Sequence, residues 1–178
     1  MAPIFHREIT ALFQEADRAK SHFAKGLALE KAVRRLFSRV PGIELAASNV
    51  KNAANTEEVD VLFWNARSRG GLYQLETPFL VECKNWGKKV SGQAVVYFAN
   101  TLRGRGCRDG ILVASSGITG DAGKLTEAHY EIACALREGQ RILVLSRVEV
   151  ENLRDATQLS SLLKRKILDL AIRGTKVL

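Results

Sequence analysis

The sequence predicts an α/β fold, a mixed sheet core of order αβββαβ flanked by helices, with one additional helix at each end of the chain. Three short apolar segments at residues 43–47, 58–64 and 79–84 follow one another, each bounded by polar or turn residues, which is typical of strands. Helical and strand patterns then alternate over residues 91–145. Because parallel strands need a crossover connection, this alternation predicts parallel pairing among the last strands.

Two helices are expected before the first strand. The first, at residues 4–20, is amphipathic, and we expect it to act as a packing arm or as a dimer contact. Its apolar face carries Phe5, Ile9, Leu12 and Ala16. The second helix covers residues 22–38 and ends before Pro41.

The second half of the chain carries the alternating elements. A helix at residues 91–103 begins at Ser91, a residue type that caps helix N-termini well. Buried strands are predicted at residues 110–115 and 141–145, with a helix at residues 121–138 between them.

Two further segments complete the predicted organisation. Residues 65–78, between the second and third strands, are expected to form a long hairpin arm. Residues 157–173 are expected to form a basic helix on which Lys164, Arg165 and Lys166 are solvated.

Composition and charge restrict the class of protein. The 178 residues suit a single domain, with a core at about residues 22–150 and the terminal helices as additions. The net charge of +8 and the pI near 9.7 favour acidic partners such as nucleic acid or an anionic membrane, although a basic surface without a partner gives the same charge. Three widely spaced cysteines form neither a disulfide framework nor a zinc pattern, and no apolar run could span a membrane. We therefore expect a cytoplasmic protein without a membrane partner.

The most informative pattern is an acid and a base two residues apart inside the apolar segment 79–84. In a strand this spacing places Glu82 and Lys84 on one face, while Phe79, Val81 and Cys83 point the other way, toward a core. Burying either charge unpaired is costly, so the pair indicates a shared task such as binding a metal ion beside a phosphate. A solvent-facing edge strand with an ion pair along one face would show the same pattern.

Two more acids extend this pattern. Asp60 interrupts the apolar segment 58–64, and in an antiparallel hairpin it would lie beside Glu82, where two carboxylates repel unless a divalent cation neutralises them. Alternatively, Asp60 merely ends a turn. Glu30 lies on the apolar stripe of the second helix, either as an outer ligand or water-positioning group or as a snorkelling or capped glutamate. Gln93, near the start of the helix at 91–103, is a weaker candidate.

Together these residues resemble the PD-(D/E)xK phosphodiesterase superfamily, and within it the Mrr-like branch of restriction endonucleases. The resemblance covers about residues 22–150 and is carried, in chain order, by Glu30, Val59-Asp60, Val81-Glu82-Cys83-Lys84, Gln93 and Ile111–Thr119. Two features depart from the pattern: no proline precedes Asp60, and the glycine-rich approach common in the Mrr-like branch is replaced by residues 55–58.

The resemblance implies a restriction-endonuclease-like fold and an Mg²⁺- or Mn²⁺-dependent deoxyribonuclease, acting as a homodimer or in a larger defence or repair complex. It implies that Asp60 and Glu82 bind the metal with the backbone carbonyl of Cys83. Lys84 would orient the nucleophile or stabilise the transition state. The remaining two residues, Glu30 and Gln93, would position water or the lysine.

Five arginines in glycine-containing loops are expected to contact DNA backbone phosphates without reading sequence. They are Arg67, Arg69, Arg103, Arg105 and Arg108. Each one alone is compatible with a solubilising role, but as a group they account for the net charge.

Other functions stay open at this point. A catalytically inactive DNA-binding module on the same fold, or a subunit that holds a partner or guide RNA on its basic faces, would share the charge. A doubly wound nucleotide- or metabolite-binding enzyme would need a glycine-rich turn directly after a strand. Residues 115–120 are a poor version of such a turn, and the later acidic partner is missing.

Overall fold

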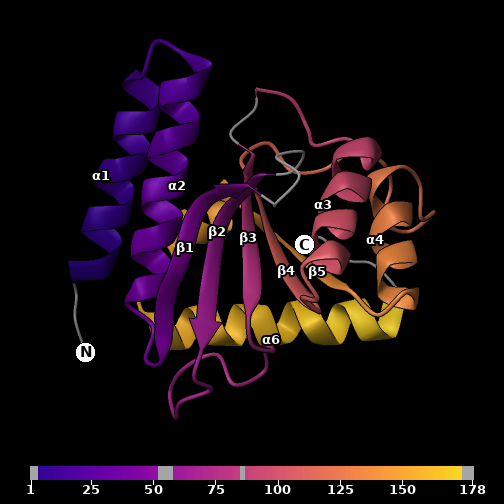
Figure 1. Cartoon of the computed structure of the whole chain (residues 1–178). Coiled ribbons are helices and arrows are strands. Elements are labelled where there is room, and N and C mark those ends of the chain that lie inside the picture. Colours follow the sequence, from indigo (N-terminus) through magenta and orange to yellow (C-terminus); the bar gives the residue numbers. More distant parts are fainter. Residues whose placement is uncertain (1–3, 52–57, 85–86, 174–178) are drawn as a thin grey trace.

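The structure is a computed structural model of the chain and describes residues 4–51, 58–84 and 87–173 (Figure 1). Residues 55–57, within the departure from the glycine-rich pattern, lie outside the described residues. No helix in the described part is both long and apolar enough to cross a membrane.

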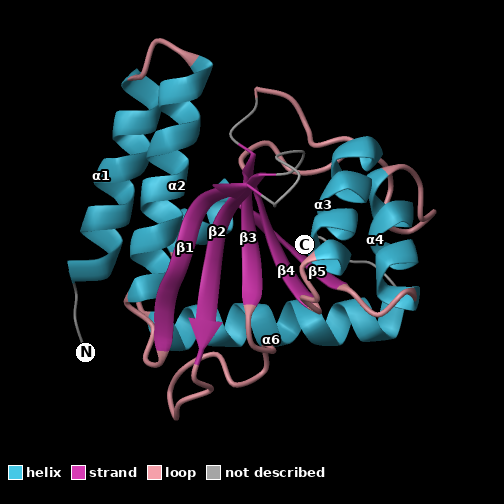
Figure 2. Cartoon of the chain, viewed as in Figure 1, coloured by secondary structure: helices cyan, strands magenta, loops and turns pink. Residues whose placement is uncertain are grey.

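A five-stranded mixed sheet forms the centre of the molecule (Figure 2). Its strands, in spatial as well as chain order, are β1 (Ile43–Lys51), β2 (Glu58–Asn65), β3 (Phe79–Lys84), β4 (Asp109–Ala114) and β5 (Arg141–Ser146). The pairs β1–β2 and β2–β3 are antiparallel, whereas β3–β4 and β4–β5 are parallel. The predicted mixed sheet and its parallel half are therefore confirmed.

Six helices surround this sheet in the described part of the chain. They are α1 (Ile4–Arg18), α2 (His22–Ser38), α3 (Gly92–Gly104), α4 (Ala128–Arg137), α5 (Arg147–Asn152) and α6 (Ala156–Arg173). In Figure 1, α1 and α2 lie side by side at one edge of the molecule, and α3 and α4 lie side by side at the other.

Side chains alternate between the two faces of the sheet along each strand, and their contacts show which helix covers which face. Phe79 packs against Phe37 of α2, with their ring centroids 5.7 Å apart. Gly110 is paired with Leu80, and a Cβ at Gly110 would come within 2.6–2.8 Å of Leu102 and Phe98 of α3. Because successive strand residues point to opposite faces, α2 and α3 cover opposite faces of the sheet. The absence of a side chain at position 110 lets α3 approach closely.

Three details of the predicted helices and strands are wrong. The first strand continues to Lys51 instead of ending at 47, because its polar end still pairs with β2 as far as Glu58. The helix predicted at 121–138 begins only at Ala128, and α5 was not predicted at all. Within residues 121–127 the Asp121 carboxylate accepts from the Lys124 amide, and Thr126 Oγ1 accepts from the Asp121 amide. Such local bonds compete with helix formation.

The fourth wrong detail is Lys166, which is 3% exposed instead of solvated. Its ammonium lies 2.7 Å from Glu149, the residue that completes the capping box of α5 with Ser146. Lys164 and Arg165 are exposed as expected.

The segment between β2 and β3 is a compact loop and not an extended arm. The buried Asn65 side chain donates to the carbonyls of Leu72 and Leu75 at 2.8 and 2.9 Å, and both leucines are buried. One amide thus supplies the hydrogen bonds that allow this loop to fold onto the core.

Replacing Asn65 by alanine is expected to lower the free energy of unfolding by about 2–3 kcal/mol, because two buried carbonyls lose their donor. Urea unfolding measures the change. Asn152→Ala, at an exposed position of α5, is the matched control and should stay within about 0.5 kcal/mol of the parent protein. An equal loss in both variants would contradict the proposed role of Asn65.

Candidate active site

The carboxyl end of β3 brings Asp60, Glu82 and Lys84 together. The antiparallel register pairs Val61 with Val81, and continuing it by one residue sets Asp60 opposite Glu82. Past that point the Cys83 amide donates to the Asp60 carboxylate at 2.7 Å instead of to a backbone carbonyl. This side-chain bond holds Asp60 against β3 at the place where the β2–β3 ladder ends.

Glu82 and Lys84 lie on one face of β3, as their spacing predicts. The Lys84 ammonium is 2.5 Å from the Glu82 carboxylate, and their side chains are only 25% and 14% exposed. This burial excludes the alternative of a fully solvent-facing ion pair.

Among the described residues of this site, acidic side chains outnumber basic ones. Burial, together with the nearby charges of Asp60 and Glu30, raises the pKa of Glu82 to about 7, and Lys84 opposes the rise. Burial alone would lower the pKa of Lys84, but Glu82 and Asp60 outweigh it and leave that pKa raised, so Lys84 stays charged. Among the described residues, the acids Glu30, Asp60 and Glu82 thus share this site with the Lys84 ammonium.

Glu30 reaches the site from α2, where it is half-buried. The helix packs against β3, and after burial and Asp60 the charge of Glu30 further raises the pKa of both Glu82 and Cys83. The structure thus unites Glu30 with Asp60 and Glu82 although 29 and 51 intervening residues separate them along the chain.

The Cys83 side chain packs on the other face of β3 against the core. Its pKa is raised well above the ordinary value, first by burial and then by Asp60 and Glu82, so the thiol stays protonated and unreactive. Only the backbone of this residue is suited to a role in the site.

Gln93 lies in the first turn of α3, after the N-cap Ser91, whose hydroxyl accepts from the Ala94 amide. The side chain of Gln93 is exposed. Its part in positioning water or Lys84 stays a prediction.

The predicted phosphate-binding arginines lie mostly away from the carboxylates. Arg67 and Arg69 follow β2, and Arg108 precedes β4, so all three lie at the end of the sheet opposite the carboxyl end of β3 (Figure 1). Arg67 and Arg108 both pair with Glu76, at 3.5 and 3.9 Å.

The other two arginines make contacts within the chain. Arg103, at the far end of α3, pairs with Glu138. Arg105 donates to the carbonyl of Val50 at 3.2 Å and thereby ties the β1–β2 hairpin to the loop after α3. For all five arginines, DNA contact stays a prediction.

Sequence reasoning missed a cleft of about 850 Å³ beside the carboxyl end of β3. The described residues that line it are His22, Gly87, Lys88, Lys89, Ser91 and Thr119. A signal for it was present, because two lysines, Lys88 and Lys89, occur within five residues of the end of the Glu-x-Lys strand, and ligands of open α/β sheets bind outside the carboxyl ends of strands.

The donor set at Asp60 and Glu82 fits a hard divalent cation. Both provide carboxylate oxygens, which Mg²⁺ and Mn²⁺ prefer. Burial and then repulsion from Asp60 raise the pKa of Glu82, and a cation between the two acids would relieve that repulsion. In the described part of the chain, no three His, Cys, Asp or Glu side chains are grouped to hold a metal ion. A cation held by the two acids would therefore depend on a backbone carbonyl, water and substrate for its other ligands.

Comparison with known proteins gives one family match. The family model Mrr_cat, described as a restriction endonuclease, matches residues 24–145, which run from α2 into β5 and include Glu30, Asp60, Glu82 and Lys84. No curated protein and no solved structure matched the chain. Since the family model spans well over half of the sequence, the chain belongs to the restriction endonuclease family that the Mrr catalytic domain represents.

Proposed function

We propose that the chain is a metal-dependent endonuclease that hydrolyses DNA phosphodiester bonds, using Mg²⁺ or Mn²⁺. The observation that carries the proposal is the contact of Lys84 with Glu82 beside Asp60, at the carboxyl end of β3 next to an open cleft. Membership of a restriction endonuclease family supports DNA as the substrate.

Asp60 and Glu82 would hold the cation through their carboxylates, with the backbone carbonyl of Cys83 as a further ligand. When bound, such a cation lowers the pKa of a coordinated water and neutralises charge on the scissile phosphate. The bond between the Cys83 amide and Asp60 orients the Asp60 carboxylate before any ligand arrives. Because the Asp60 side chain is already ordered, less conformational entropy is lost when a cation binds.

Lys84 would serve the nucleophile and the phosphate. Its raised pKa keeps the ammonium charged at neutral pH, and its partial burial strengthens the field it exerts on a neighbouring phosphate oxygen. With Glu82 as a metal ligand, the Lys84 ammonium would be able to donate to the substrate.

Glu30 and Gln93 would position water or Lys84, from α2 and α3 respectively. Because cleavage of both strands of a duplex requires two sites and each chain provides one, a homodimer is the favoured assembly, alone or within a larger defence or repair complex. We place this activity in the cytoplasm.

Supercoiled plasmid tests the proposal. The purified protein with Mg²⁺ or Mn²⁺ should convert it to nicked and linear forms, and EDTA should prevent this. Asp60→Asn should lower the rate by about 100-fold or more, because a neutral amide binds a hard cation poorly.

Asp155→Asn is the control for Asp60→Asn. Asp155 accepts from the Gln158 amide at the start of α6, and asparagine caps a helix equally well, so activity should be retained. Cleavage that persists in Asp60→Asn at the wild-type rate would reject Asp60 as a metal ligand. DNA binding without any cleavage would instead favour the inactive binding module.

A further inference from the structure

The cleft beside β3 is held in a defined shape by backbone hydrogen bonds. The Val90 amide donates to the Gly117 carbonyl, and the Thr119 amide donates to the Val90 carbonyl, both at 2.9 Å. These bonds join the loop before α3 to the loop after β4 and place Lys89 and Ser91 opposite Thr119. The cleft is thus bounded by backbone that the sheet positions.

The described lining of the cleft is basic. Lys88 and Lys89 are both exposed, and no Asp or Glu occurs among the lining residues that the structure describes. Neither lysine forms an ion pair within the described part of the chain, in contrast to Arg67, Arg103 and Arg108. Their charges are therefore available to an anionic ligand.

Two helix N-termini meet next to these lysines. The backbone of Gly92, at the start of α3, packs against Glu127 and Ala128 at the start of α4, since a Cβ there would lie 3.3–3.4 Å from their backbone atoms. Both helices point their partially positive amide ends toward this region. The N-terminal ends of α3 and α4 add to the positive electrostatic potential of Lys88 and Lys89.

The cleft adjoins the candidate active site. Gly87 follows Lys84 by only three residues, so their Cα atoms are at most about 11 Å apart. The Ser115 amide, from the loop after β4, donates to the Lys84 carbonyl at 3.0 Å. A DNA strand bound at Lys84 therefore needs to extend by only a few nucleotides to reach Lys88 and Lys89.

A physical requirement connects the two places. The carboxylates of Glu30, Asp60 and Glu82 lie together at the carboxyl end of β3, and carboxylates repel a polyanion. A chain that cleaves DNA needs positive potential close to these acids, and the arginines at the opposite end of the sheet cannot supply it at this range because salt screens charges beyond about 8–10 Å.

We propose that this cleft is the subsite that binds the backbone phosphates flanking the scissile bond, with Lys88 and Lys89 as the phosphate ligands. The inference rests on the proposed nuclease function and specifies where its substrate strand is held. The contacts are to phosphates and carry no sequence preference.

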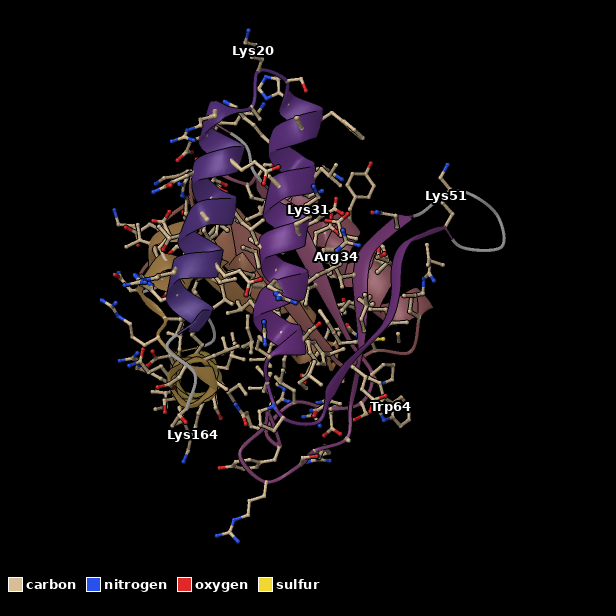
Figure 3. All side chains as sticks on the ribbon, turned by 90° about the vertical axis from the view of Figure 1, so that its left-hand side faces the viewer. Lys20, Lys31, Arg34, Lys51, Trp64 and Lys164 are labelled. Atoms are coloured by element: carbon tan, nitrogen blue, oxygen red, sulfur yellow. The ribbon has the colours of Figure 1, made fainter. Side chains whose placement is uncertain are left out.

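Binding of a fluorescently labelled DNA duplex in EDTA tests the subsite without cleavage. The double variant Lys88→Ala/Lys89→Ala should bind roughly tenfold more weakly near physiological salt, and the slope of log affinity against log salt should fall by about 2, since each lost phosphate contact removes about 0.9. The control is Lys164→Ala/Arg165→Ala, which removes the same charge from exposed positions on α6. Figure 3 shows Lys164 at the end of the molecule away from Lys20. Lys20 precedes His22, which lines the cleft, by two residues.

The outcomes separate the subsite from the nuclease function. Plasmid cleavage by the wild type, combined with equal salt slopes for the cleft and control variants, would overturn the subsite alone. A reduced slope specific to the cleft variant, without wild-type cleavage in Mg²⁺ or Mn²⁺, would support the subsite and reject the nuclease function. Absence of DNA binding by the wild type would overturn both.

Discussion

Lys84→Ala is expected to lower the rate of plasmid cleavage by about 10²–10³-fold, the range measured when one preorganised donor to a developing charge is removed. The affinity for DNA in EDTA should change less than about threefold, because one of many phosphate contacts is lost. Lys84 is the ammonium that contacts the Glu82 carboxylate. Rate at saturating DNA and affinity by fluorescence anisotropy measure the two effects separately.

Lys164→Ala is the matched control for Lys84→Ala, because it removes the same group from an exposed site on α6. It should cleave at the wild-type rate. Lys84→Arg keeps the charge but not the compact ammonium, and we expect only partial recovery. If Lys84→Ala cleaves as fast as the control, the catalytic role of Lys84 is wrong.

Glu82→Gln is expected to remove cleavage and at the same time to stabilise the metal-free protein at pH 8. The folded-state pKa of Glu82 is about 7, against an ordinary value of 4.5. A raised folded pKa contributes stability that is fully present below 4.5 and is lost as pH rises through 7, so at pH 8 the ionised side chain opposes folding. The neutral amide avoids this opposition.

The gain at pH 8 should be about 1–3 kcal/mol, at the lower end because Lys84 loses its partner, and it corresponds to roughly 3–8 °C in Tm for a chain of this size. At pH 5 the difference should largely disappear, since wild-type Glu82 is then protonated. Thermal unfolding in EDTA at both pH values measures this.

Added Mg²⁺ provides a second readout of Glu82. At pH 8 it should raise the Tm of the wild type and leave that of Glu82→Gln almost unchanged, because only the wild type retains both carboxylates. Glu44→Gln, at an exposed position of β1, should behave as the wild type throughout. A lower Tm for Glu82→Gln at pH 8 would show that the Lys84 ion pair outweighs the repulsion from Asp60 and Glu30.

The sequence by itself determined the elements and the face that carries Glu82 and Lys84. Strand alternation is a local property with a period of two residues, so an acid and a base two apart inside an apolar segment must share a face wherever the strand lies. The same locality explains why α2 and β3 begin and end as predicted. It also explains why the start of α4 was predicted wrongly. The hydrogen bonds of the Asp121 and Thr126 side chains, which precede the helix, leave no trace in the spacing of apolar residues.

Only the tertiary structure decided which residues meet. The β2–β3 register sets Asp60 beside Glu82, and the packing of α2 on the sheet brings Glu30 to them. A contact between residues far apart in the chain depends on register and helix docking, which the whole core determines and no local pattern encodes. For the same reason, the sequence predicted the loop arginines as one DNA-binding group, although most of them lie away from the carboxylates in the structure. Lys88 and Lys89, which lie near the carboxylates, are seen to line a cleft only in the folded chain.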